Sequence, residues 1–374
     1  MQTGGAQGVH GGCIRIFARS GAVTLANHLS ARIRADGPLT LAQYMADALT
    51  HPTMGYYVTR DPLGTDFTTA PEISQIFGEL IGLALAQAWL DGGSPAPITL
   101  AELGPGRGTL MADALRATAR VPGFHDAVRL HLVEASPVLR AAQAERLAAH
   151  APTWHDAVDD LPDGPILLIA NEFLDALPIR QWRRAGRGWS ETLVTLRDGA
   201  LARAAGPPAP VAALAHRLDE PEGTVVELCP ALCATVGAVA ARVARGGAAI
   251  WVDYGHWRSR GDTLQALRGG AAVDPLDAPG TADLTAHVDF EAVARAATPC
   301  AATGMTPQGV LLERLGATAR ARALARARPE RAEAVAAAHR RLLHPAEMGD
   351  LFKAVALHPA DAPPPPGFDP PAPA

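Results

Sequence analysis

A glycine-rich turn carries the clearest chemical signal in the sequence. Residues 102–108 contain a Gly-x-Gly-x-Gly motif that follows a predicted strand at 98–103 and precedes a predicted helix at 111–119. Because glycine has no Cβ atom, the chain can bend sharply here, and a ligand can lie against bare backbone beside a helix N-terminus. The segment therefore predicts a ligand site at the edge of a sheet.

The spacing of these glycines bears on the kind of ligand. A dinucleotide site uses Gly-x-Gly-x-x-Gly and places pyrophosphate at the helix N-terminus, a pattern that this turn fits poorly. Glu134 ends the next predicted strand, where its carboxylate could accept hydrogen bonds from ribose hydroxyls. The shorter motif with an upstream acid, Glu102, is typical of S-adenosylmethionine sites. Taken alone, the turn leaves an NAD-dependent oxidoreductase, or a turn without a ligand, as alternatives.

An alternation of short apolar runs and helical segments must position this turn. Such an alternation is typical of a parallel sheet with crossover helices, and it predicts an α/β, Rossmann-like and mostly parallel fold. The predicted strands are 98–103, 128–133, a weak one at 152–154, 166–170 and 248–252, and the helices are 111–119, 137–149 and 231–245. Alternating polar and apolar residues at 178–203 predict antiparallel strands outside the main sheet. Residues 351–357 are predicted to form a last antiparallel strand.

Additions flank this core within one expected domain at 37–357. An N-terminal extension at 37–92 contains an amphipathic helix that Thr40 caps, a long loop at 55–69, and an apolar helical stripe from Pro71 to Trp89. Further segments are insertions at 178–228 and 255–309, the second expected over the carboxyl edge of the sheet, and a helix at 329–343. We expect residues 1–36 to be a poorly ordered leader, with a transit peptide as the alternative, and 358–374 to be an extended or disordered, proline-rich tail.

Composition excludes several classes of partner. The formal net charge of -5 and the pI near 6.2 give no long-range attraction to nucleic acid. No apolar run reaches the length of a membrane span, so we expect no membrane insertion. The chain contains 4 cysteines, too few for a disulfide framework, and the pair Cys229 and Cys233 has no second pair at ligand spacing, so no metal is predicted.

Several longer strings resemble the MidA family of class I methyltransferases. They are residues 69–79, 102–108, 171–178, 252–255, 283–290 and 348–353. The resemblance implies S-adenosylmethionine as the cofactor and, from the mitochondrial members, a protein arginine in a subunit of respiratory complex I as the acceptor. It also implies a cytoplasmic location in a bacterium and the mitochondrial matrix in a eukaryote. The oligomeric state is not predicted.

Matching positions receive expected roles from this resemblance. Glu102 should approach the amino-acid end of the cofactor, Glu134 its ribose and Asp156 its adenine side. The full set of expected cofactor-binding residues is Glu102, Gly104, Gly106, Gly108, Glu134, Asp156, Pro71 and Glu72.

The expected acceptor site lies directly after the strand at 166–170. Two carboxylates can hold the planar fork of donors that an arginine presents, and Glu172 and Asp175 are the candidates, beside Asn171. His287 is a further candidate. The alternatives are that Glu172 only hydrogen-bonds a loop, that Asp175 begins a helix, and that the chain is a non-catalytic assembly factor for complex I.

Overall fold

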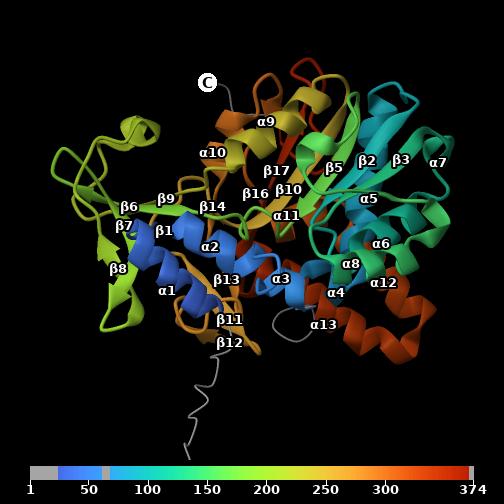
Figure 1. Cartoon of the computed structure of the whole chain (residues 1–374). Coiled ribbons are helices and arrows are strands. Elements are labelled where there is room, and N and C mark those ends of the chain that lie inside the picture. Colours follow the sequence, from blue (N-terminus) through green and yellow to red (C-terminus); the bar gives the residue numbers. More distant parts are fainter. Residues whose placement is uncertain (1–23, 61–67, 370–374) are drawn as a thin grey trace, which may run out of the picture.

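The computed structural model describes residues 24–60 and 68–369. Its main sheet has the order β15-β17-β10-β5-β2-β3-β4, in which β15 is the short strand Ala301–Ala302. Neighbouring strands from β10 to β4 run parallel (Figure 1). These strands are β2 (Ile98–Leu103), β3 (Val128–Val133), β4 (Thr153–His155), β5 (Ile166–Asn171) and β10 (Gly247–His256). β17 (Phe352–His358) runs antiparallel to β10. The α/β, Rossmann-like fold is confirmed, including the weak strand near 152–154.

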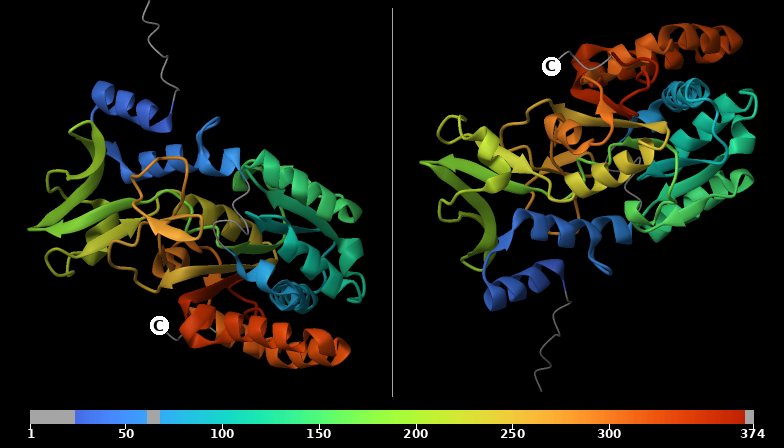
Figure 2. Two further views of the ribbon diagram at one scale, coloured as in Figure 1. Left: turned by 90° about the horizontal axis from the view of Figure 1, so that it is seen from below. Right: turned by 90° about the horizontal axis from the view of Figure 1, so that it is seen from above.

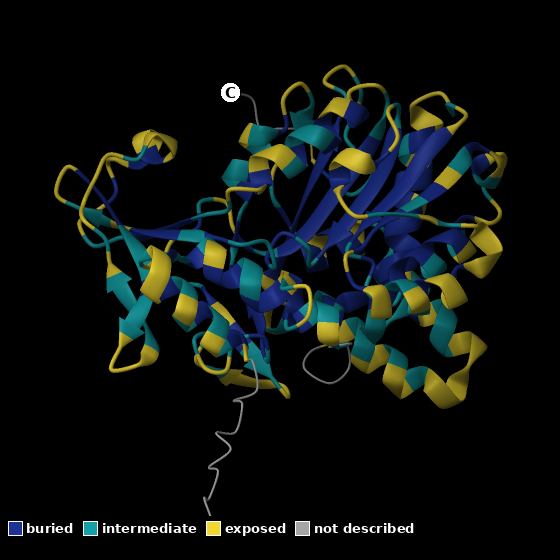
Figure 3. Ribbon diagram, in the orientation of Figure 1, coloured by how far each residue is buried: buried dark blue, intermediate teal, exposed yellow. Residues whose placement is uncertain are grey.

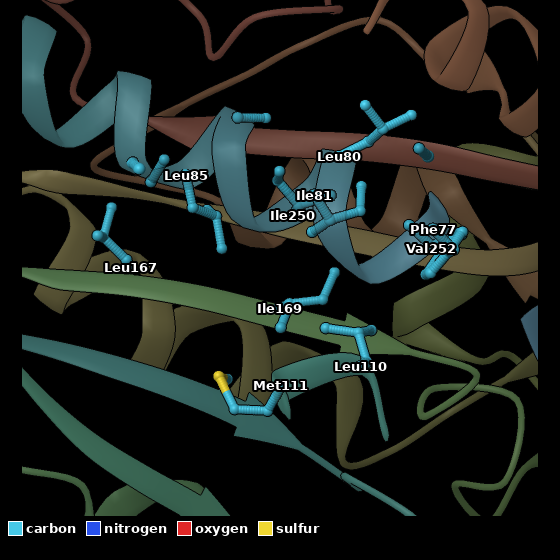
Figure 4. Close-up of a cluster of buried hydrophobic side chains, with 14 of the residues drawn as sticks. Phe77, Leu80, Ile81, Leu85, Leu110, Met111, Leu167, Ile169, Ile250 and Val252 are labelled. Carbon is cyan, nitrogen blue, oxygen red and sulfur yellow. The ribbon is translucent and has the colours of Figure 1, made fainter. Parts of the chain in front are cut away.

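Both faces of the sheet are covered by helices, which explains why its central strands are apolar throughout. Leu167 and Ile169 of β5 belong to one core cluster, together with residues of α5 (Gln75–Asp91). Leu168 points to the opposite face and packs in a second cluster with α9 (Leu232–Val243). Figure 4 shows the first cluster, and Figure 3 shows the strands as the most buried layer.

Two glycines let α5 approach α6 (Thr109–Thr118) closely. A Cβ atom on Gly78 would lie 2.7 Å from the carbonyl oxygen of Leu110, and one on Gly82 would lie 2.6 Å from the Cα of Ala114. Real Cβ atoms do not come so close to backbone, so any side chain would push the helices apart. This packing fixes α6, and with it the glycine turn that α6 follows.

The insertions build a second layer beside the main sheet. β6 (Arg180–Ala185), β7 (Gly188–Arg197) and β8 (Ala200–Ala205) form antiparallel pairs, as expected for 178–203. A smaller antiparallel sheet contains β11 (Gln265–Arg268), β12 (Ala271–Val273) and β13 (Asp283–Thr285). Helices α1 (Leu25–Asp36) and α2 (Leu41–Thr50) lie against these strands in both views of Figure 2, and α2 begins after the expected cap, Thr40.

The expectation of a poorly ordered leader is wrong for residues 25–36. They form α1 (Leu25–Asp36), which Thr24 caps by accepting a hydrogen bond from the Asn27 N–H. Leu25, Leu29 and Ile33 are buried in a core shared with α2 and the insertions. Their four-residue spacing is the helical signal that the arginine-rich pattern concealed. The rest of the expected leader, residues 1–23, lies outside the described residues, as does 61–67 in the loop expected at 55–69.

The C-terminal helices are α11 (Gln308–Arg314), α12 (Ala317–Ala327) and α13 (Ala332–Leu343). The helix predicted at 329–343 is present from residue 332, whereas α12 was missed, because only two alanines of α12 are buried and no apolar stripe marks it. Figure 3 shows the outer sides of these helices as exposed. Over residues 24–60 and 68–369, no helix has the length and apolar character needed to cross a membrane.

Of the two conformations expected for the proline-rich tail, the disordered one is wrong for its described part, which contains no helix or strand beyond β17 but packs onto the fold. Phe368 is buried in the same core cluster as Leu311 and Leu312 of α11. Arg314 hydrogen-bonds the carbonyl oxygen of Gly367 at 3.1 Å. The proline content predicted an extended chain, but one aromatic side chain is enough to anchor it.

Replacing Phe368 with alanine should therefore destabilise the protein. Truncating a buried phenylalanine removes transfer free energy and leaves a cavity, so the free energy of unfolding should fall by about 3 kcal/mol. Urea unfolding followed by circular dichroism measures the change. Val310→Ala, which truncates an exposed aliphatic residue on α11, is the control and should shift the free energy of unfolding by less than about 0.5 kcal/mol. An equal effect of the two variants would contradict the anchoring role.

Candidate active site

A cavity of about 840 Å³ opens at the carboxyl ends of the parallel strands. One part of its lining is the glycine turn after β2 together with Glu134 after β3. Another part follows β5 and contains Asn171, Glu172 and Asp175. All of the sequence-predicted site residues except Gly108 line this cavity. Ligands of doubly wound sheets bind at this edge.

The glycine turn has a backbone that only glycine adopts readily. Gly104, Gly106 and Gly108 have φ values of 61°, 55° and 75°, all in the left-handed region. A Cβ atom on Gly104 would lie 3.1 Å from the ring of Phe173, and Gly108 is the N-cap of α6. The left-handed backbone and the nearby side chains explain why glycine occupies positions 104 and 108. Gly106 lies in the cavity wall. A bare-backbone cradle is the result.

Glu102 lies at the base of this cradle with an unsatisfied oxygen. Its side chain is buried, and its Oε2 has no hydrogen-bond partner in the described part of the chain. Burial raises the pKa of this carboxyl to about 8, and the nearby charge of Glu134 adds to the effect. A buried polar atom without a partner requires an explanation. A ligand that carries a cationic donor would satisfy it.

Glu134 is held in place by a buried amide that the sequence analysis missed. Gln143 donates from Nε2 both to Glu134 Oε2 at 3.1 Å and to the carbonyl oxygen of Gly106 at 2.7 Å. Trp154 donates to Gln143 Oε1 at 2.8 Å, and the Ser136 N–H donates to Glu134 Oε1 at 2.8 Å. Gln143 therefore joins the acid to the glycine turn. Only its position four residues after the apolar Leu139 could have indicated that it faces inward.

The remaining predicted cofactor residues occupy the rim of the cavity. Asp156 is exposed and accepts a hydrogen bond from Arg140 Nη2 at 2.6 Å. Pro71 and Glu72 line the wall beside α6, where Glu72 Oε1 accepts a hydrogen bond from Thr109 Oγ1 at 2.5 Å. This bond joins the N-terminal extension to the first residue of the helix that follows the glycine turn.

Glu172 has a backbone conformation that is unusual for its residue type. Its φ is 51°, and its Oε1 accepts hydrogen bonds from Asn171 Nδ2 at 3.0 Å and from the Ala70 N–H at 3.4 Å. Burial raises the pKa of its carboxyl to about 8, and Asp175 adds to the shift. Strained non-glycine residues cluster at functional sites, because the surrounding structure must hold them in place.

Asp175 lies in a turn rather than at the start of a helix. Asp253, from β10, fixes this turn, because its Oδ2 accepts hydrogen bonds from the backbone N–H groups of Phe173, Leu174 and Asp175 at 3.0 to 3.2 Å. Burial raises the pKa of Asp175 to about 6, while a hydrogen bond with the Tyr254 hydroxyl opposes the shift. Asp175 Oδ1 has no partner among the described residues. Two acids with raised pKa values therefore face one cavity.

His287 lines the cavity beside Tyr254. Its ring lies edge-on to the ring of Tyr254 with centroids 5.5 Å apart, and burial lowers its pKa. The neighbouring Asp289 has a structural role instead, because it caps α10 (Phe290–Ala296) and pairs with Arg217 at 3.0 Å. Of the aromatic residues near the site, Tyr57 lines the cavity and Tyr56 is buried in the core.

The sheet order, the glycine cradle and the acid after β3 together define a nucleoside-binding enzyme of the class I methyltransferase type. The model of a family described as "Putative S-adenosyl-L-methionine-dependent methyltransferase" matches residues 80–311. The chain belongs to this family, the MidA-type methyltransferases, and S-adenosylmethionine is its cofactor.

Similar proteins support this assignment over nearly the whole chain. A Drosophila melanogaster protein named "Protein arginine methyltransferase NDUFAF7 homolog, mitochondrial" is 38% identical, with 91% of this chain and 86% of the relative covered. The Homo sapiens protein arginine methyltransferase NDUFAF7, also named mitochondrial, is 35% identical over 89% of this chain and 82% of its own. A likely methyl transferase from Burkholderia thailandensis, crystallised with S-adenosyl-homocysteine, has a TM-score of 0.79 and 33% identity over 93% of each chain.

Proposed function

We propose that this enzyme methylates a guanidinium nitrogen of an arginine side chain in a protein, with a subunit of respiratory complex I as the partner. The pair Glu172 and Asp175 carries the proposal, because both acids face the cavity beside the cofactor cradle. No ion pair joins either acid to an arginine or lysine in the described part of the chain. The names of the relatives support the same acceptor.

The residues around the glycine turn fit the cofactor. Glu102 would accept hydrogen bonds from its ammonium group, Glu134 would accept from its ribose hydroxyls, and Asp156 would lie at its adenine side. Gly104 and Gly106 would present bare backbone, while Pro71 and Glu72 would line the cavity wall beside α6. When bound, the cofactor supplies an electrophilic methyl group. The residues of the chain need only orient the acceptor, exclude water and take up a proton.

Glu172 and Asp175 would hold the acceptor guanidinium and take up the proton that it loses. A guanidinium offers five N–H donors in one plane, and two carboxylates can hold it at two edges while one nitrogen faces the methyl donor. Forming the new N–C bond requires that this nitrogen lose one proton. Glu172, with its pKa of about 8, is the stronger base of the two and would accept that proton at a carboxylate oxygen.

The ionisation of Glu102 predicts a pH-dependent cofactor affinity. The pKa of Glu102 is about 8 in the free protein, and a bound ammonium group would lower it, so binding should release a proton. Affinity for S-adenosylhomocysteine should thus rise as the pH approaches 8 and fall by up to about tenfold per unit as the pH drops towards 6. Titration calorimetry in buffers of different ionisation enthalpy measures both effects. In Glu102→Gln the proton release should disappear, and its persistence would assign it to another group.

The acceptor is tested by incubating the full chain with methyl-labelled S-adenosylmethionine and a lysate enriched in respiratory subunits, then locating the label by mass spectrometry. Label on an arginine of a complex I subunit supports the whole proposal. Label on lysine, or on a small molecule, contradicts the arginine acceptor. Binding of the subunit without label, by a chain that binds the cofactor, favours the assembly-factor alternative. The cytoplasmic or mitochondrial location remains a prediction, although the relatives named here are mitochondrial.

A further inference from the structure

Two residues outside the methyltransferase sheet add a third acid to the acceptor side of the cavity. Tyr57, from α3 (Tyr56–Thr59), donates a hydrogen bond from its hydroxyl to Asp283 Oδ1 at 2.6 Å. Asp283 belongs to β13 of the insertion and is buried. The two residues are 226 positions apart, and both line the cavity. The N-terminal extension and the insertion therefore meet at this carboxylate.

The small sheet directs Asp283 towards the proposed acceptor site. Side chains alternate along a strand, and Leu284 packs into the core with α2, while Asp283 and Thr285 on either side of it line the cavity. One residue beyond the strand, the Ala286 N–H donates to the carbonyl oxygen of Asp175 at 3.0 Å. This hydrogen bond attaches the end of β13 to the turn that carries Asp175. Asp283 is also among the charges that raise the pKa of Glu172.

Two unsatisfied oxygens indicate that a donor-rich group belongs in this space. Asn171 Oδ1 and Asp175 Oδ1 have no hydrogen-bond partner in the described part of the chain, and both residues are more than nine-tenths buried and line the cavity. The carboxylates of Glu172 and Asp175 repel each other when both are ionised, and a cation between them would relieve this repulsion. A guanidinium would bring both the positive charge and enough N–H groups for several acceptors.

We propose that Asp283 is a specificity-determining residue that contacts the acceptor guanidinium opposite Glu172 and Asp175, and that Tyr57 is a positioning residue that orients it. This inference rests on the proposed arginine acceptor. It adds the residues by which the site would select an arginine side chain over a neutral or lysine side chain. A neutral side chain of the same shape would bring no positive charge to the ionised carboxylates of Glu172 and Asp175. An ammonium group, with three donors and no planar fork, would satisfy fewer of the acceptor oxygens.

The test uses the full chain saturated with S-adenosylhomocysteine and three small probes. N-acetyl-arginine methylamide is titrated by NMR beside its citrulline counterpart, which is a neutral isostere, and its lysine counterpart. The wild-type chain should bind the arginine probe at least about tenfold more tightly than the other two, as expected for charge-assisted hydrogen bonds. In Asp283→Asn the affinity for arginine should fall about tenfold, with the affinity for S-adenosylhomocysteine unchanged within about twofold.

Two further variants separate selection from folding. Tyr57→Phe retains the carboxylate and should weaken the preference for arginine over citrulline by about threefold, a readout that a purely structural role would not move. Asp277→Asn removes an exposed acid of the same insertion, outside the cavity, and should leave all affinities unchanged. If Asp283→Asn binds the arginine probe like the wild type while Glu172→Gln loses it, the third acid is not used and the proposed function stands. If the wild-type chain does not prefer arginine to citrulline, the arginine acceptor itself is wrong.

Discussion

The Gly106→Val variant should lose affinity for S-adenosylhomocysteine by about 100-fold or more while remaining folded. Gly106 has a φ of 55° in the wall of the cavity, and its carbonyl oxygen is held by Gln143. A β-branched residue is strained at positive φ, and its side chain would project from backbone that a ligand approaches closely. Titration calorimetry gives the affinity, and circular dichroism reports the fold.

Gly199→Val is the matched control for backbone strain. Gly199 has a φ of 83° in the hairpin turn between β7 and β8, and a Cβ atom there would meet nothing within 4 Å. Both variants should be destabilised by roughly 1–3 kcal/mol, because both force a valine into the left-handed region. Only the variant in the cradle should lose cofactor binding. Unchanged affinity in Gly106→Val would show that the cofactor does not approach this turn.

Glu172→Gln should lower kcat by about 1,000-fold with little change in cofactor affinity. The substitution preserves size, and its amide oxygen can still accept the hydrogen bonds from Asn171 and the Ala70 N–H. It removes the negative charge and the proton acceptor. Single-turnover transfer of the labelled methyl group to the acceptor measures the rate. Calorimetry with S-adenosylhomocysteine confirms that the cradle still binds the cofactor.

Glu333→Gln, an exposed position on α13, makes the same chemical change away from the cavity and should retain the wild-type rate. A rate for Glu172→Gln within about fivefold of the wild type would exclude Glu172 as the proton acceptor, because general-base catalysis contributes much more than this. Asp175→Asn would then be the next substitution to measure.

Local patterns predicted the parts of the site that depend on neighbouring residues. The glycine turn was recognisable because a strand, three glycines and a helix follow one another within about twenty positions of sequence. The strand boundaries of β2 and β3 agree with the prediction, and Glu134 lies where the end of β3 should place it. Buried parallel strands leave a continuous apolar run that few other structures share.

Residues that act through distant contacts were harder to predict. Gln143 is a polar residue on a helix, and only the fold shows that it joins Glu134 to the glycine turn. The pairing of Tyr57 with Asp283 links the short helix α3 to a late insertion, and no spacing in the sequence indicates it. For α1 and Phe368, charge and proline content suggested disorder, whereas a few apolar side chains hold these segments against the core.

The wall of the cavity contains residues from distant parts of the described chain, from Leu49 in α2 to Phe352 in β17. During synthesis, the ribosome must therefore release almost the entire polypeptide before the pocket can close around a ligand. Contacts between such distant residues form slowly, because a long loop must be closed first. A nascent or prematurely terminated chain consequently lacks a complete pocket, and catalytic competence arrives only with the last strand.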